Sequence, residues 1–223
     1  MEDTFEQLES KTGRYKVNTA YLLGEGGFGK VYKGVDLKNG MPLAFKVVDL
    51  SVRDAQTQRK YRLTLEEIEL MKLLKGKPYI LEIFDDFEIG QFKSRRGKFL
   101  VLVLELCAYG NLEEFMEKRR KNSPFSEPDA ADIFDQILGG VEIVHQQKYL
   151  HRDLSSANIF VKDADESKSR LKIKIADFGL SRVVEKKALY SVAGTPGCMA
   201  PEIAQGREYD LSADVYSLGI VFL

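Results

Sequence analysis

The sequence of 223 residues is poor in cysteine and contains no tryptophan. Its two cysteines, Cys107 and Cys198, lie far apart and form no Cys-x-x-Cys pair. A disulfide framework and a cysteine-based zinc site are therefore not expected. Because so little cysteine is typical of proteins from a reducing compartment, we expect a cytoplasmic protein.

Long hydrophobic runs and an excess of charge of one sign are also missing. The longest apolar run, Phe99–Leu104, has six residues, whereas a membrane-spanning helix needs roughly 20. The first residues, Met1–Glu6, are polar and acidic, which argues against a signal peptide, and Glu2 excludes myristoylation. The formal net charge is −1, so no strong field favours nucleic acid or an acidic membrane as a partner. We expect neither.

The first third of the chain shows short β-strand patterns and one long helical pattern. β-Branched and aromatic residues between turn signals predict three antiparallel strands, over Val17–Leu23, Lys30–Gly34 and Pro42–Asp49. Apolar residues at helical spacing, without glycine or proline, predict a helix over Asp54–Lys75. Two further strands are predicted over Ile80–Ile89 and Lys98–Leu106, joined by a solvated hairpin loop over residues 91–97.

The rest of the chain is mainly helical. Asn111 with Glu114, and Ser126 with Asp129, have the spacing of capping boxes. They predict a short helix to about Lys121, and then a longer helix whose apolar side is formed by Ile133, Ile137, Leu138, Val141 and Val144. Two short strands are predicted over Ile159–Lys162 and Leu171–Ile175. We therefore divide the chain into an N-terminal extension (1–14), a β-rich lobe (15–106) and a helix-rich lobe (107–223). Ligand sites favour the cleft between two such lobes.

A glycine-rich stretch, Gly24–Gly29, is the first motif that can carry chemistry. Glycines allow the backbone to approach a polyanion and to direct amide N–H groups at phosphates. The same pattern also occurs in ordinary hairpin turns. The dinucleotide-binding version of this motif needs a helix directly after the loop, whereas Lys30–Lys33 has a strand pattern. The sequence therefore predicts a strand–glycine–strand flap and no dinucleotide site.

Lys46 lies inside an otherwise apolar strand, 17 positions after Gly29. A buried charge is costly unless it is paired, so the lysine either reaches water at the strand edge or has an acidic partner. The following helix offers three candidates, Glu66, Glu67 and Glu69.

Two acids and one amide, Asp153, Asn158 and Asp177, follow in the helix-rich lobe at the ends of predicted elements. Carboxylate and amide oxygens are ligands that Mg²⁺ takes when phosphates supply the rest. Each residue alone has the simpler interpretation of a turn or cap residue. The three in this order, after the glycine loop and the lysine, point to a phosphate-handling site.

Together these motifs resemble the signature of eukaryotic protein kinases, in order and over about residues 15–223. The matching positions are Gly24, Gly26, Gly29 and Val31; Ala44–Lys46; His151–Asp153 with Asn158; Asp177–Gly179; and Ala200–Glu202. The resemblance implies an α+β bilobal fold, with a small β-rich N-lobe carrying one regulatory helix. It also implies a mainly helical C-lobe, which in this sequence lacks its last helices.

The resemblance implies transfer of the γ-phosphate of Mg-ATP to serine or threonine hydroxyls of protein substrates. In this family the glycine flap covers the ATP phosphates, and Lys46 contacts the α- and β-phosphates. Glu67 best matches its ion-pair partner. Asp153 orients the substrate hydroxyl or accepts its proton, and Asn158 and Asp177 hold Mg²⁺.

Further positions receive roles only through the resemblance. Val31, Ala44 and Phe160 match the apolar walls around adenine, Leu104 matches the gatekeeper, and Glu105 and Cys107 offer the carbonyl and N–H groups of the hinge. His151 and Phe178 match packing residues, and Asp214 matches a buried acid that braces the His151–Asp153 loop. His145 has no partner in this scheme and is expected on ordinary helix surface.

The segment Gly194–Glu202 is similar to the loop with which serine/threonine kinases read the residue after the target. Tyr190 and Ser191 precede it on the activation segment. Arg152 can pair with a phosphate on either residue, although a solvated hydroxyl without a role is the simpler interpretation.

Two departures from the family pattern stand out. Ser155 occupies the position where serine/threonine kinases place a lysine, so no cation of this loop is expected at the γ-phosphate. The chain also ends at Leu223, inside an apolar helix predicted from Asp210 onward, whose exposed side would need a covering partner. These departures leave an alternative: a nucleotide-binding pseudokinase or scaffold.

Overall fold

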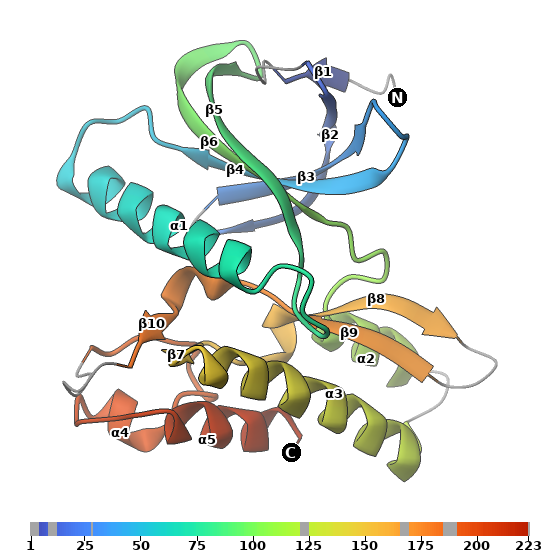
Figure 1. The fold of residues 1–223 in the computed structure, drawn as a ribbon, viewed down its shortest axis with the longest axis vertical. Helices are drawn as coiled ribbons and strands as arrows, with labels where there is room; N and C mark the ends of the chain where they lie inside the picture. Colours follow the sequence, from blue (N-terminus) through green and yellow to red (C-terminus); the bar gives the residue numbers. More distant parts are fainter. Residues whose placement is uncertain are drawn as a thin grey trace. The chain divides into compact units, whose positions relative to one another are not determined.

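The computed structural model describes residues 5–8, 13–27, 29–120, 125–165, 170–184 and 191–222. The chain forms two compact units, one of Met1–Leu73 with Glu82–Leu106 and one of Leu74–Leu81 with Cys107–Leu223. Figure 1 shows their elements. Each unit is described by itself below.

The first unit contains a six-stranded sheet with the order β1-β2-β3-β4-β6-β5, in which all neighbouring strands are antiparallel. The strands are β1 (Phe5–Gln7), β2 (Tyr15–Gly26), β3 (Gly29–Asp36), β4 (Pro42–Asp49), β5 (Ile83–Phe92) and β6 (Arg95–Glu105). Strand β4 has the predicted bounds, because a proline, a β-branched run and an aspartate mark them clearly. Strands β2 and β3 extend beyond both predicted ends, whereas β5 begins at Ile83 instead of Ile80 and ends later, and β6 begins earlier and ends one residue sooner than predicted.

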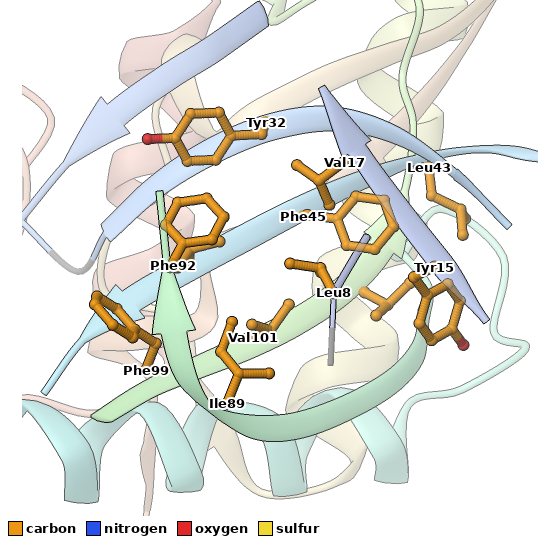
Figure 2. Packing of buried hydrophobic residues seen from close by; sticks show 12 residues of the cluster. Leu8, Tyr15, Val17, Tyr32, Leu43, Phe45, Ile89, Phe92, Phe99 and Val101 are labelled. Carbon is orange, nitrogen blue, oxygen red and sulfur yellow. The ribbon is translucent and has the colours of Figure 1, made fainter. Parts of the chain in front are cut away.

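The sheet is curled, so that strands far apart in its order meet across one core (Figure 2). This core, called the aromatic core below, combines aromatic and aliphatic side chains: Leu8, Tyr15, Val17, Tyr32, Leu43, Phe45, Val47, Ile89, Phe92, Phe99, Val101 and Val103. The Tyr15 ring on β2 stacks on Phe87 of β5 with centroids 5.7 Å apart, and its hydroxyl donates to Asp85 at 3.0 Å. Burial, followed by the hydrogen bond to Asp85, raises the pKa of Tyr15 to about 12. The phenol therefore stays a neutral donor inside this core.

The segment before residue 15 takes part in this fold. Strand β1 pairs with β2, and Leu8 is 2% exposed within the aromatic core. The Arg14 guanidinium binds the fully buried Asp36 through Nε at 2.9 and 3.0 Å and lowers the pKa of that carboxyl. The described part of the N-terminal extension thus adds a strand to the sheet.

The hairpin predicted over residues 91–97 is present and most of these residues are exposed, but its loop is shorter than predicted. Strands β5 and β6 continue through it, with Gln91 opposite Arg96 and Phe92 opposite Arg95. Only Lys93 and Ser94 form the turn, with φ of 50° and 61°, as in a two-residue hairpin turn. Neither is Gly or Asn, so the sequence gives no signal for this turn. Phe92 is buried in the aromatic core.

Helix α1 (Ala55–Leu73) lies within the predicted range. The Asp54 side chain accepts from the Thr57 N–H at 2.7 Å and caps the helix, and this hydrogen bond lowers the pKa of Asp54. One side of the helix is buried, including Leu63, Glu67 and Met71. The predicted helix is confirmed.

The second unit contains four α-helices and two small antiparallel sheets among its described residues. The helices are α2 (Leu112–Arg120), α3 (Glu127–Gln146), α4 (Pro201–Ala204) and α5 (Ser212–Val221). One sheet pairs β8 (Ile159–Asp165) with β9 (Arg170–Ile175), and the other pairs β7 (Tyr149–Leu150) with β10 (Arg182–Val183). Short 3₁₀ turns cover Ser156–Asn158 (η1) and Phe178–Leu180 (η2).

The helix caps and apolar faces largely follow the sequence pattern. Ser126 and Asp129 form a complete capping box at α3, and Asn111 accepts from the Glu114 N–H at 2.8 Å at α2. Leu138 departs from the expected buried side of α3, because 43% of its surface is exposed. Helix α5 leaves Val215 58% exposed, in line with the apolar exposure expected at this end of the chain.

Candidate functional site

The glycine-rich stretch forms the hairpin between β2 and β3 and is not followed by a helix. Gly24 lies opposite Val31, and Gly26 lies opposite Gly29. A Cβ atom on Gly29 would come within 2.5 Å of the Val47 carbonyl oxygen, so this glycine is required by the sheet itself. A Cβ atom on Gly24 or Gly26 would meet no atom of the described residues within 4 Å. These two glycines therefore border open space.

One face of the sheet carries four of the predicted site residues. Val31 pairs with Lys46, and Ala44 pairs with Leu104. Directly paired residues point to the same face, and so do residues two apart along a strand. Val31, Ala44, Lys46 and Leu104 thus share a face, while Phe45 points to the aromatic core on the other.

Lys46 is paired with Glu67. Its Nζ donates to the two Glu67 carboxylate oxygens at 2.7 and 2.9 Å, and the side chains are 10% and 2% exposed. Glu66 and Glu69 lie on the exposed side of α1. The choice among the three glutamates is therefore settled by the helical phase of α1, and the pairing with Glu67 is confirmed.

The expected hinge and adenine-wall residues are divided between the units. Glu105 ends β6 opposite Leu43, and its N–H donates to the Glu82 carbonyl at 2.9 Å. Cys107 begins the second unit, where its carbonyl accepts from the Gly110 N–H at 3.3 Å. Phe160 lies half-buried on β8 in the second unit, opposite Lys174.

Asp153 has a carboxylate that is held on both oxygens. Thr195 Oγ1 donates to Oδ1 at 2.5 Å, and Asn158 Nδ2 donates to Oδ2 at 2.8 Å. Asn158 Nδ2 also donates to the Asp153 carbonyl at 2.8 Å. Since Nδ2 faces Asp153, the Asn158 Oδ1 atom is directed away from it. The sequence placed Asp153 and Asn158 in one loop but gave no indication of the Thr195 contact.

The loop before Asp153 is braced by Asp214 of α5, as the resemblance implied. The buried Asp214 carboxylate accepts from the His151 N–H at 2.8 Å and from the Arg152 N–H at 2.9 Å. His145 Nε2 lies 2.8 Å from the same carboxylate. Because a carboxylate only accepts, His145 donates through Nε2. The expectation of ordinary helix surface for His145 is therefore wrong.

Asp177 has the left-handed backbone conformation, with φ 60° and ψ 69°, and its carboxylate accepts from the Gly179 N–H at 3.4 Å. A left-handed φ is uncommon for a residue with a side chain. Asp177 precedes the buried Phe178, whose ring centroid lies 5.0 Å from that of His151. His151 and Phe178 are thus packing residues.

Ser155 is 3% exposed, and its hydroxyl has no hydrogen-bond partner among the residues that the structure describes. Arg152 is the one lysine or arginine of the described loop 151–158, and its guanidinium is bound to Leu180, Ser191 and Tyr209. Tyr190, the other expected phosphate-bearing residue, lies outside the described residues.

Comparison with known proteins assigns the chain to a family. Residues 17–223 match the family model described as the protein kinase domain. The chain belongs to the protein kinase family. Its mixed α+β fold, with a curled β-rich first unit and a second unit that carries most of the helices, is consistent with that family.

The chain is similar to several named serine/threonine kinases. A probable serine/threonine-protein kinase zyg-1 of Caenorhabditis briggsae is 36% identical over 89% of this chain and 25% of its own length. A serine/threonine-protein kinase PLK4 of Xenopus tropicalis is 34% identical over 89% of this chain and 19% of its own length. A probable myosin light chain kinase of Dictyostelium discoideum is 36% identical over 89% of this chain and 47% of its own length.

The kinase-family chain therefore spans between about a fifth and a half of the length of these relatives. In the described parts of the chain, no helix is both long and apolar enough to cross a membrane.

Proposed function

We propose that this protein transfers the γ-phosphate of Mg-ATP to serine or threonine hydroxyls of protein substrates. The observation that carries the proposal is the orientation of Asp153. Thr195 and Asn158 each take one carboxylate oxygen, and each oxygen keeps acceptor capacity for a further donor. A carboxylate fixed in this way can receive the hydrogen bond of a substrate hydroxyl and then its proton.

The proposal assigns nucleotide binding to the shared face of the first unit. Gly24 and Gly26 fit a phosphate-binding role, because no atom of the described residues would contact a Cβ added at either position. The Lys46 ammonium, held by Glu67, supplies positive charge for the α- and β-phosphates. Val31, Ala44 and Leu104 supply an apolar surface for the base, and the Glu105 backbone supplies a hydrogen bond. The roles of Phe160 as an adenine wall and of Cys107 in the hinge rest on the family resemblance alone.

The proposal assigns the metal to Asn158 and Asp177. An amide oxygen and a carboxylate oxygen are both hard donors that suit Mg²⁺. The Asn158 Oδ1 atom is the one available for this, since its nitrogen is engaged by Asp153. When bound, Mg²⁺ neutralises phosphate charge and aligns the transferred group. The protein's own contribution is then mainly positioning and charge stabilisation.

Preference for serine and threonine is supported by the segment Gly194–Glu202 and by the names of the related serine/threonine kinases. Thr195 in this segment contacts Asp153 directly. The same segment thus reaches the residue proposed to act on the acceptor hydroxyl.

A direct test measures phosphate incorporation into matched peptides that carry Ser, Thr or Tyr as the only hydroxyl. We expect Asp153→Asn to reduce turnover by about 10²–10³-fold without loss of nucleotide-induced thermal stabilisation. Asp163→Asn is the matched control, because Asp163 is exposed and contacts Lys172 at the surface. Incorporation into the tyrosine peptide alone, or equal turnover of both variants, would contradict the proposal.

A second function, nucleotide binding without turnover, is favoured by one observation. Ser155 replaces the lysine of the family, and the described cation of the loop, Arg152, is engaged elsewhere. Thermal stabilisation by Mg-ATP with no phosphate incorporation would support this function. If turnover is only slow, Ser155→Lys should raise it by up to about 10²-fold, since the long lysine stem can carry its charge out of a buried position.

A further inference from the structure

Arg152 is a buried cation whose described partners are all uncharged. It is 4% exposed. Its Nε donates to the Leu180 carbonyl at 2.6 Å, and its Nη1 donates to the Ser191 hydroxyl at 2.6 Å and to the Tyr209 hydroxyl at 2.9 Å. A buried charge needs hydrogen bonds to offset the loss of water. Within the described parts of the chain, two hydroxyl groups and a carbonyl provide them.

The Tyr209 phenol closes a complete hydrogen-bond network with Ser191. It accepts from Arg152 and donates its single proton to the Ser191 carbonyl at 2.8 Å. The Ser191 hydroxyl lies 3.2 Å from the phenol oxygen and can donate to it while accepting from Arg152. Each proton in this ring has an acceptor, and Tyr209 is only 5% exposed. Arg152 and Tyr209 are thus buried members of the network, and Ser191 is its exposed member. The hydrogen bonds of such a network reinforce one another.

The network holds the backbone that carries Thr195. Ser191 is followed within a few residues by Gly194, where a Cβ atom would come within 2.6 Å of the Arg152 carbonyl oxygen. The backbone therefore runs directly against Arg152 at this point. Thr195 comes next and donates to Asp153. A shift of Ser191 would move the donor that orients the proposed base.

We propose that Tyr209 is a positioning residue. Its hydroxyl, which is hydrogen-bonded to Arg152 and Ser191, holds residues 191–195 against Arg152 when no phosphate is present, and we call this contact the latch. The inference rests on the proposed function, because it concerns the orientation of Asp153. The neutral latch and a negative charge at position 191 are alternative ways to hold the same guanidinium. A carboxylate at position 191 therefore makes the phenol dispensable.

The experiment compares Tyr209→Phe, Ser191→Glu and the double variant with the unmodified protein, freed of phosphate by phosphatase. Tyr216→Phe is the matched control, since Tyr216 is an exposed tyrosine on α5. Amide hydrogen exchange over residues 191–200 reports the latch without any substrate, and peptide phosphorylation reports kcat and the KM for ATP.

For Tyr209→Phe we expect about tenfold faster exchange in this segment and about tenfold lower kcat, the factor that one hydrogen bond to a charged group supplies. The KM for ATP should change by less than about twofold. Ser191→Glu should restore most of both losses in the double variant. If Tyr209 had only a structural role, Ser191→Glu would not restore either quantity in the double variant.

The latch is refuted if Tyr209→Phe exchanges like Tyr216→Phe, or if Ser191→Glu does not restore slow exchange in the double variant. An unmodified protein without phosphotransfer would refute the proposed function instead. The exchange comparison would still decide the latch in that case, because it needs no turnover.

Discussion

The two units hold their candidate site residues by different physical means. In the first unit Lys46 is held by a buried ion pair with Glu67, on the face of a sheet. In the second unit Asp153 lies in a loop and is fixed by hydrogen bonds from Thr195 and Asn158. Asp214 secures the backbone of that loop. The described contacts are thus of different kinds: a buried ion pair holds Lys46, and a set of hydrogen bonds holds Asp153 and its loop.

This difference determines how each region should fail. Removal of one partner from a buried ion pair leaves a charge in a low-dielectric environment and is costly. Removal of one member of a hydrogen-bond network leaves the other members in place. Substitutions at the site residues of the first unit should therefore lower the free energy of unfolding, and substitutions at those of the second unit should mainly lower turnover.

The largest effect is expected for Asp177→Asn in the second unit. The change removes a charge from the proposed metal site and hardly alters the shape of the side chain. Mg²⁺-dependent phosphotransfer should fall by about 10³-fold, while the thermal unfolding midpoint stays close to that of the unmodified protein. Unchanged turnover would remove Asp177 from the mechanism, and a large drop in the midpoint would show that the two regions do not differ as described.

In the first unit, Glu67→Gln should lower the free energy of unfolding by about 3 kcal/mol, because the Lys46 ammonium loses its carboxylate. Glu66→Gln is the control on the exposed side of α1 and should stay within about 0.5 kcal/mol. The double variant Lys46→Met with Glu67→Leu should recover most of the stability and none of the activity. Urea unfolding and a phosphorylation assay measure the two quantities. Equal effects of the two glutamates would contradict the buried pair.

His145→Ala tests the network of the second unit. Asp214 loses one donor and keeps the His151 and Arg152 N–H groups, so we expect a loss of about 1.5 kcal/mol in unfolding free energy. Gln146→Ala, next to it on the exposed side of α3, is the control. A loss as large as that of Glu67→Gln would show that the network depends on a single contact after all.

The smallest effect is expected for Ser155→Ala. The buried hydroxyl has no partner among the described residues, and removal of an unsatisfied polar group is neutral or stabilising, by up to about 1 kcal/mol. Thermal unfolding measures the change. Clear destabilisation would indicate that the hydroxyl is satisfied by an ordered water.

Local patterns in the sequence predicted most helices and strands. The detailed arrangement of the site residues depends on contacts between residues that are far apart in the sequence. Strand β4 and helix α1 followed from alternation and helical spacing, which are properties of neighbouring residues. The contact of His145 with Asp214 joins residues 69 positions apart, and no local signal marks it. The turn at Lys93 and Ser94 lacks the glycine or asparagine that such turns favour, so both flanking strands were predicted to stop short of it.

The motifs gave the candidate residues, while packing chose among them. The residues alone left three glutamates open as partners of Lys46, and the family resemblance favoured Glu67. The burial of one side of α1 shows physically why Glu67 is the partner. The resemblance brought Arg152 and Ser191 together, but it gave no role to Tyr209. The contacts of Tyr209 with both residues join distant parts of the chain, and no local signal marks them.

Strand β1 has a practical consequence for anyone who shortens this protein. The family match begins at residue 17, which makes that position a tempting place to start a recombinant fragment. Such a cut would remove Leu8 and Tyr15, both buried in the aromatic core. Each large apolar side chain buried there contributes about 1.5–3 kcal/mol, against a total stability of about 5–15 kcal/mol for a domain. A soluble, active fragment should therefore keep its first strand.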